Sequence, residues 1–317
     1  LSVGVAALSV ATTFASVENY SNVGITLNDT TDSATNISAT QNVTIDAKKA
    51  NVLNAHTQGV GVGGISVAVN HATIEDGGTI DDRKTGNATA KITGTNGTFT
   101  ANSFHLGATN NTIAKLSAGN VAVSVLGISR MRGKGVMTMG ADVDVAGGAF
   151  NAGTVEFASM LGDANGRTLE GNVKGHNISV GAVAPDTVTL TTTATSNVNV
   201  KDSTFGESTN LILDNESYVD RKAYIYDVTV GGVAVGNSYA DVIGTETMTT
   251  TLAGNDGTTN KLNSLQVLTY GENTGKALAD AGGGGLVGYV GAHVMNKSTN
   301  EVSSTLSGNW EATGEVY

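Results

Sequence analysis

Three short clusters of charged side chains are the places where this sequence could carry out acid–base chemistry on a substrate. Cleavage of a polysaccharide needs carboxylates, often with Lys, Arg or a bound calcium ion, converging on one face of the protein. Each cluster occurs once, and none pairs with another at a turn-like spacing, so we interpret them as solvated turns and edges. The clusters are Asp81-Asp82-Arg83-Lys84, Arg130-Met131-Arg132-Gly133-Lys134, and Asp220-Arg221-Lys222 with Tyr224 and Tyr226.

Metal and phosphate sites are not indicated by the remaining candidates. The sequence has no Gly- and Asp-rich calcium-binding nonapeptide and no EF-hand loop. The run Gly282 to Gly285 is not followed by the Gly-Lys-Ser/Thr ending of a phosphate-binding loop. The sequence therefore predicts no catalytic residue, no metal ligand and no cofactor. The histidines do not fall at metal-ligand spacing, and we expect surface or loop positions for all five: His56, His71, His105, His176 and His293.

The elements that must position any such residue belong to a repeat of about 55 residues, a period that indicates a solenoid, propeller or array. Val43-Thr44-Ile45-Asp46-Ala47 has later copies at Thr98 to Ala101, Val155 to Ala158, Leu211 to Asp214 and Leu265 to Leu268. If Ile45, Phe99, Phe157, Leu213 and Val267 are equivalent, their residue numbers differ successively by 54, 58, 56 and 54. Runs of Gly, Ala and Val alternate with these copies, at residues 3–10, 60–69, 121–128, 178–184, 228–235 and 283–290.

Composition and charge exclude several classes of protein. The net charge of −11 and the pI near 4.8 disfavour binding to nucleic acid or to an anionic membrane surface. No apolar run reaches the roughly 18 to 20 residues of a membrane helix. The apolar opening of the chain matches the internal Gly/Val runs in phase, so we interpret it as repeat and not as a signal peptide. Both ends lie within repeats, and we expect a fragment of a longer protein.

Within each repeat, polar and apolar residues alternate as in half-buried strands. We expect strands at residues 42–47, 88–92, 141–145, 196–200 and 247–252, and no significant helix. Turns are predicted at Asp76-Gly77, Asn96-Gly97, Gly147-Gly148, Asn165-Gly166 and Asp256-Gly257.

A right-handed parallel β-helix, or β-solenoid, over residues 1–317 buries such strands with small aliphatic side chains, and its Gly/Val runs would let the coil bend at corners. We expect three turns of roughly 18 to 19 residues in each repeat, with two of about 27 as the alternative. Three turns give a rod of 16 or 17 turns, on the order of 80 Å long. A β-propeller and a string of small β-sandwiches remain alternatives.

The phased VxVxA-type strands, the run GVGVGGISVAVN at residues 59–70 and the phrase Gly97 to Ser103 resemble repeats of filamentous haemagglutinin-type adhesins. The Gly/Val runs are especially similar to the large leukotoxin-like filamentous adhesins of anaerobic Gram-negative bacteria. The resemblance implies secretion by a two-partner or autotransporter route to the cell surface. It also implies a right-handed β-helical fibre that attaches to receptors or glycans of host cells or other bacteria.

From this we expect a non-catalytic stalk or fibre segment of a secreted adhesin. One alternative is a carbohydrate-active β-helical enzyme or carbohydrate-binding module, with residues 218–226 lining a groove. Another is lateral self-association into filaments or a surface layer. Thr191 to Thr193 and Thr249 to Thr251 would suit ice binding only if they recurred every turn. Sugar attachment is open at sequons that include Asn28, Asn36, Asn42, Asn87, Asn96, Asn110, Asn177, Asn215 and Asn296.

Overall fold

The computed structural model describes residues 2–28, 34–77, 86–94, 96–164, 166–255 and 257–317. This part of the chain is all β, with no helix, as the sequence predicts. The strands are β1 (Ser2–Asn19), β2 (Val23–Asn28), β3 (Ile37–Ser38), β4 (Asn42–Asp76), β5 (Gly86–Thr93), β6 (Thr98–Ala146), β7 (Ala149–Gly162), β8 (Leu169–Lys201), β9 (Thr204–Phe205), β10 (Asn210–Val230), β11 (Val233–Ala253), β12 (Thr259–Leu262), β13 (Ser264–Gly284), β14 (Val287–Ser307) and β15 (Asn309–Ala312).

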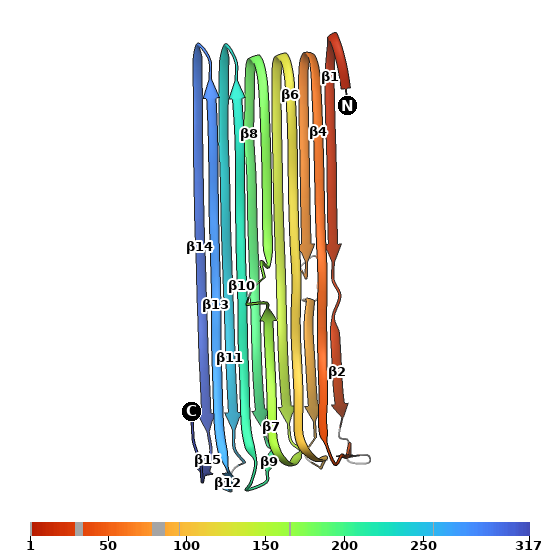
Figure 1. The fold of residues 1–317 in the computed structure, drawn as a ribbon, viewed down its shortest axis with the longest axis vertical. Helices are drawn as coiled ribbons and strands as arrows, with labels where there is room; N and C mark the ends of the chain where they lie inside the picture. The colour runs from red at the N-terminus through yellow and green to blue at the C-terminus, as the bar shows by residue number, and fades with distance from the viewer. Residues whose placement is uncertain (1, 29–33, 78–85, 95, 165, 256) are drawn as a thin grey trace.

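Each repeat runs up the long axis of a flat slab, turns, and runs down again (Figure 1). β10 and β13 ascend while β11 and β14 descend, and β4, β6 and β8 each contain both directions. All pairing is parallel between one repeat and the next: Leu213 pairs with Phe157 on one side and with Val267 on the other, so the residue numbers of its partners differ from its own by 56 and by 54. The sheet closes as a small barrel of four parallel strands, β6, β7, β10 and β8.

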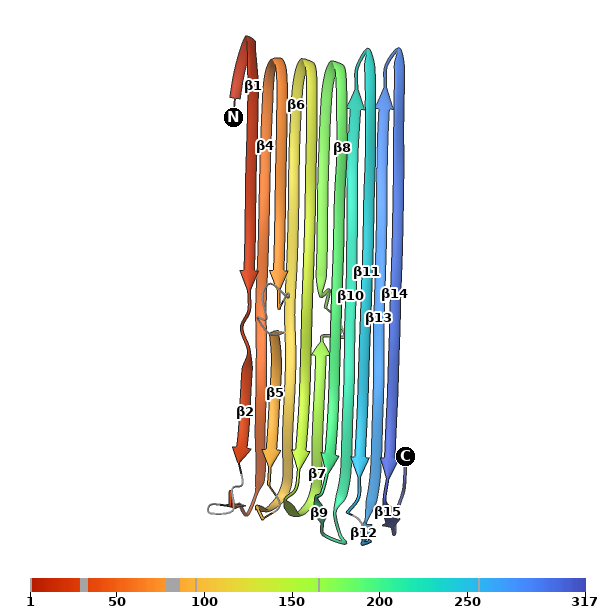
Figure 2. The same ribbon diagram turned by 180° about the vertical axis from the view of Figure 1, so that it is seen from behind.

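The expectation of three turns in each repeat, and with it the long thin rod, is wrong. Because strands pair at an offset of one whole repeat, each repeat makes a single circuit. The strands are correspondingly long, because β10, β11, β13 and β14 each have 21 residues. The long dimension of the slab is therefore the strand direction, and the repeats stack across it (Figures 1 and 2).

The proposed equivalence of Phe99 with Ile45 and Phe157 is also wrong. Ile45 pairs with Leu106, and Leu106 pairs with Phe157, so Leu106 is the true equivalent. Phe99 instead pairs with Ile37 and with Phe150.

Ascending and descending strands form two layers whose facing side chains make the core. A Cβ added to Gly133, on a descending strand, would lie 2.6 Å from Leu116 Cδ1 and 3.3 Å from Val173 Cγ2 of the ascending layer. At this height Leu116 and Val173 already fill the space between the layers, so only a glycine fits opposite them. The phenylalanine rings of the core gather at one end, where Phe99, Phe150 and Phe205 stack with centroids 4.9 and 5.5 Å apart.

The Gly/Val runs form the turns at the other end of the slab, as their glycines suggest. The chain reverses direction there between β10 and β11 and between β13 and β14. Predicted turns also occur where expected, because Gly77, Gly147, Gly148 and Gly257 have positive φ. Asn165 and Asp256 lie outside the described residues. The predicted short strands are all present, as parts of β4, β5, β6, β8 and β11.

Candidate functional site

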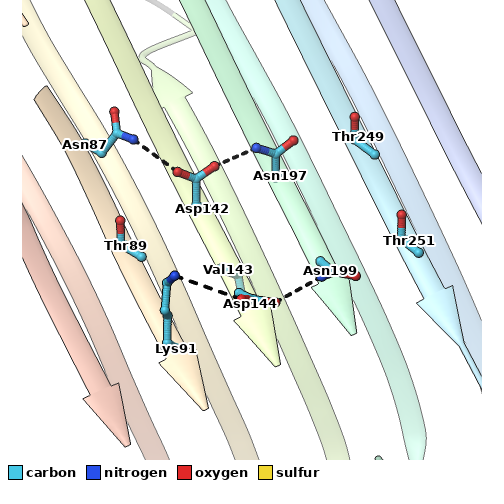
Figure 3. Close-up of a pocket in the computed structure, with 10 residues that line it drawn as sticks. All are labelled: Asn87, Thr89, Lys91, Asp142, Val143, Asp144, Asn197, Asn199, Thr249 and Thr251. Carbon is cyan, nitrogen blue, oxygen red and sulfur yellow. Dashed lines mark hydrogen bonds and ion pairs between the residues drawn. The ribbon is translucent and has the colours of Figure 1, made fainter. Parts of the chain in front are cut away.

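A polar trough lies on the outer face of the descending layer (Figure 3). Its volume is about 650 Å³, and Asn, Asp and Thr side chains from neighbouring repeats line it. In-register pairing builds it: Thr89, Asp142, Asn197 and Thr249 occupy one rung. Each of these residues points outward because its strand neighbours point into the core.

Asp142 lies at the centre of the trough and is held by amides on both sides. Asn197 donates to it at 2.7 Å and Asn87 at 3.2 Å. Burial and the nearby charge of Asp144 raise the pKa of Asp142, although both amides and Lys91 oppose the rise. Asp144 repeats the arrangement one rung lower, with Asn199 at 3.0 Å and Lys91 at 4.0 Å. Side chains of the neighbouring strands thus satisfy the carboxylates of Asp142 and Asp144 with hydrogen bonds and an ion pair.

A second polar cluster lies on the outer face of the ascending layer. His105 bridges two carboxylates, with Nε2 3.0 Å from Asp46 and Nδ1 2.8 Å from Glu156. Burial opposes ionisation of Asp46, but a hydrogen bond from Lys48 and the charges of His105 and Lys48 keep its pKa below the usual value. Asp214 stands nearby, and burial together with the charges of Glu216 and Glu156 raises its pKa to about 6.

Aromatic side chains extend this second cluster along the same face. The hydroxyl of Tyr218 donates to Glu216 at 3.2 Å, and the rings of Tyr218 and Tyr270 lie 5.7 Å apart. A hollow of about 200 Å³ is lined by His105, Asp214 and Glu216. Here the structure brings together an acid of raised pKa, the three carboxylates of Asp46, Glu156 and Glu216, and a tyrosine pair, of which the sequence indicated only Tyr218 as a candidate.

Arg221 contradicts the interpretation of Asp220-Arg221-Lys222 as a solvated edge. Its side chain is fully buried between the layers and donates to Thr192 at 2.6 Å, to Ser298 at 3.0 Å and to Asn273. Burial lowers its pKa to about 10 despite the charge of Glu246. Gly244 provides the space, because any Cβ there would clash with the guanidinium. Arg221 is therefore part of the core.

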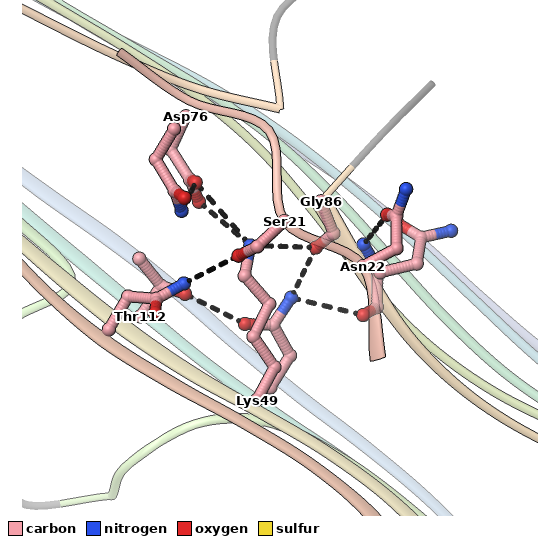
Figure 4. A network of polar contacts seen from close by, with 11 residues as sticks. Ser21, Asn22, Lys49, Asp76, Gly86 and Thr112 are labelled. Atoms are coloured by element: carbon pink, nitrogen blue, oxygen red, sulfur yellow. Dashed lines mark hydrogen bonds and ion pairs between the residues drawn. The ribbon is translucent and has the colours of Figure 1, made fainter. Parts of the chain in front are cut away.

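Lys49 and Asp76 form a second buried polar cluster (Figure 4). Lys49 Nζ lies 3.2 Å from Asp76 Oδ2 and donates to the carbonyl of Gly86 at 3.2 Å. Both side chains are almost completely buried, and Asn110 donates to the same carbonyl at 2.7 Å. Burial raises the pKa of Asp76 even though Lys49 and Asn19 oppose it. This ion pair joins an ascending strand to a descending one.

The remaining sequence candidates are scattered. Arg130, Arg132 and Lys134 point outward along β6, with Lys134 3.0 Å from Glu75, whereas Met131 between them is buried. The cluster at residues 81–84 lies outside the described residues. All five histidines lie on strands and none in a loop. Within the described ranges, no group of three or more His, Cys, Asp or Glu could hold a metal ion.

Three of the sequon asparagines are inaccessible in the folded chain. Asn110, Asn177 and Asn215 are buried and donate hydrogen bonds to backbone carbonyls. The two threonine runs do not stack on each other, since Thr191 pairs with Ile243 and Thr249 with Asn197. An ice-binding array of these threonines is therefore not formed.

The part of the chain that the structure describes contains no helix that could cross a membrane. No protein-family model, no curated protein and no solved structure matches this chain.

Proposed function

We propose that this chain is a non-catalytic structural segment of a large secreted bacterial surface adhesin. In this proposal each repeat is one flattened coil of a right-handed β-solenoid, and the stack supports attachment to host cells or other bacteria. The observation that carries the proposal is the parallel pairing of every repeat with the next at an offset of one repeat, from β1 to β14. The resemblance of the repeats to filamentous haemagglutinin-type adhesins supports the same role.

The outer faces also support a structural role. Asp142 accepts hydrogen bonds from amides of the two neighbouring repeats, and His105 is held between carboxylates of the same two repeats on the opposite layer. Polar side chains that bond along the stack add cross-strand stabilisation to the backbone ladder. Such a face resists bending between repeats, which a stalk requires.

Force spectroscopy tests the proposal directly. A stack of coils pulled from both ends should open one circuit at a time, because each repeat contacts only its neighbours. Each rupture should lengthen the chain by about 55 residues, which is roughly 20 nm of extended backbone. A single rupture that releases the whole chain would count against a stack of equivalent coils. Beads coated with the chain should also adhere to host cells or bacteria, and failure to adhere to any surface would limit the role to support.

The tyrosine and carboxylate cluster favours a second candidate function, binding or cleavage of a glycan. Tyr218 and Tyr270 offer apolar ring faces beside Glu216 and Asp214, and an acid with a pKa of about 6 suits proton transfer near neutral pH. Incubation with acidic polysaccharides, monitored for unsaturated products and for retention on immobilised glycan, tests it. Tyr218→Ala should abolish retention, whereas the control Tyr239→Ala, at an exposed tyrosine of the descending layer, should leave it unchanged. If the unaltered chain gives no unsaturated product and is not retained on immobilised glycan, this candidate is eliminated.

A further inference from the structure

One end of the slab is an exposed apolar surface. At the turn of each repeat, large aliphatic side chains point into solvent instead of into the core. Five of them form one continuous rung across the stack, in which Gly181 takes the fourth place. We call this surface the apolar ridge. Its rung residues and their exposed fractions are Leu8 (64%), Ile65 (44%), Leu126 (52%), Val233 (53%) and Val287 (64%), with Val180 (64%) beside Gly181.

The ridge carries no charge in any of the six repeats, although the chain as a whole has 45 charged residues, 17 basic and 28 acidic. Its flanking strands are also uncharged for several residues on both sides of each turn. The stretches without Asp, Glu, Lys or Arg are residues 1–17, 50–74, 116–129, 175–185, 228–240 and 281–296.

Such a surface is too large to be a chance scatter of apolar residues. Fifteen large apolar side chains at this end, between Leu8 and Tyr289, are at least 40% exposed. Soluble monomers rarely expose a contiguous apolar patch of more than a few hundred Å². A stable interface uses roughly 20 to 30 residues on each side, and the ridge approaches the lower limit of that range.

We propose that the apolar ridge is an interface through which two copies of this chain dock end to end about a two-fold axis. The distribution of charge over the surface favours a second copy of the chain as the partner at the ridge. Two chains of net charge −11 repel each other through most of their surfaces. At the ridge the nearest outward charged side chains, such as Arg130 and Asp280, lie about four residues below the turn, roughly 14 Å away along the strand.

Charges on the two copies would therefore be separated by about 28 Å, more than three times the Debye length of about 8 Å at physiological salt. Shape is also suitable, because rungs of one ridge repeat at the spacing of paired strands, about 4.8 Å, so side chains of one copy can pack between rungs of the other.

A lipid surface is a poorer occupant. The ridge has no Trp to anchor it at a membrane interface, and no Lys or Arg lies closer to its rung than Arg130, four residues from Leu126. The acidic chain would also be repelled by anionic lipids.

Sedimentation velocity of the whole chain over a range of concentrations tests the proposal. We expect a monomer–dimer equilibrium that persists or strengthens as salt rises, because apolar contacts are not screened. The double variant Leu126→Glu/Val233→Glu should weaken dimerisation by about 100-fold or more, since it buries unpaired charges at the contact. The matched control Val52→Glu/Met295→Glu adds the same charge at outward apolar positions outside the ridge and should dimerise normally.

The chain has no cysteine, so single cysteines report the symmetry of the contact. Val180 lies at the middle of the ridge, next to the two-fold axis, and Leu8 lies at one end. Val180→Cys should form a disulfide-linked dimer under mild oxidation, and Leu8→Cys alone should not. A chain that stays monomeric at all concentrations would overturn the proposal. A dimer that persists in the variant Leu126→Glu/Val233→Glu would also overturn it. So would a monomer that floats with phosphatidylcholine vesicles.

Discussion

Asp227 and Asp186 form a buried acid pair whose replacement should stabilise the protein in a pH-dependent way. Both side chains are buried, on β10 and β8 respectively. A Cβ on Gly175 would lie 2.7 Å from Asp227 Oδ1 and 2.9 Å from Asp186 Oδ2, so both carboxyl groups crowd the same small space beside this glycine. Neither oxygen has a hydrogen-bond partner among the described residues. The groups facing the pair are the amide of Met131 and the hydroxyl of Thr229.

The magnitude follows from the pKa of Asp227. Burial raises it from 3.8 to about 6, while burial and the charge of Asp227 raise the pKa of Asp186 well above its usual value. A folded state that holds the proton more tightly than the unfolded state loses stability as pH rises from about 4 to about 6. At 1.36 kcal/mol for each pKa unit, ionisation of Asp227 costs about 3 kcal/mol above pH 6. Asp227→Asn should remove that cost.

Native-state hydrogen exchange of the β10 amides is the suitable assay, because it measures local stability without requiring the whole stack to unfold together. At pH 7.5 the Asp227→Asn variant should exchange about 100-fold more slowly than the unaltered chain, and near pH 4 the two should nearly coincide. The exposed neighbour variant Asp280→Asn should match the unaltered chain at both pH values. Equal effects of Asp227→Asn at both pH values, or stability that rises with pH in this window, would refute the reasoning.

Three further substitutions test the core. Lys49→Met should cost about 3 to 5 kcal/mol of unfolding free energy, because it strands the buried charge of Asp76, and Lys49→Met/Asp76→Leu should recover most of it in urea titrations. Phe150→Ala should cost about 3 to 5 kcal/mol by calorimetry, since its ring stacks on two others, and a loss below about 1 kcal/mol would contradict the aromatic stack. Gly162→Ala should cost about 2 kcal/mol or more, because its φ is positive and its Cβ would meet the carbonyl of Tyr218; Gly257→Ala, with nothing within 4 Å, should cost less.

The repeat, the all-β class and the turns could be predicted because they depend on local chemistry. The glycine-rich runs recur in phase, and each one makes a turn at the same end of the slab. Gly77 and Gly147 sit at positive φ where only local sequence is needed to place them.

The length of the strands could not be predicted, because polar residues interrupt the inward row. Along β10 the buried row begins with Leu211 and Leu213 and then mixes polar with apolar side chains: Asn215, Ser217, Val219, Arg221, Ala223, Ile225, Asp227 and Thr229. A row with that composition loses hydrophobic alternation after a few residues, although the strand has 21 residues. Typical strands of about five or six residues then favour several short turns in each repeat. For the same reason nothing in the sequence indicated that Arg221 belongs to the buried row.

Buried polar pairs between the layers provide the register that the small aliphatic residues do not. Side chains on a strand alternate with a period of two, so a slip by two residues would keep the apolar row facing inward. Val, Ala and Thr are similar enough in size that such a slip would cost little packing energy. Lys49 would then face Ile74 in place of Asp76, and leaving a buried charge unpaired costs several kcal/mol. Arg221 imposes the same constraint through Thr192 and Ser298. The buried polar residues interrupt the hydrophobic alternation by which strands are recognised in the sequence. The same residues therefore fix how the two layers face each other.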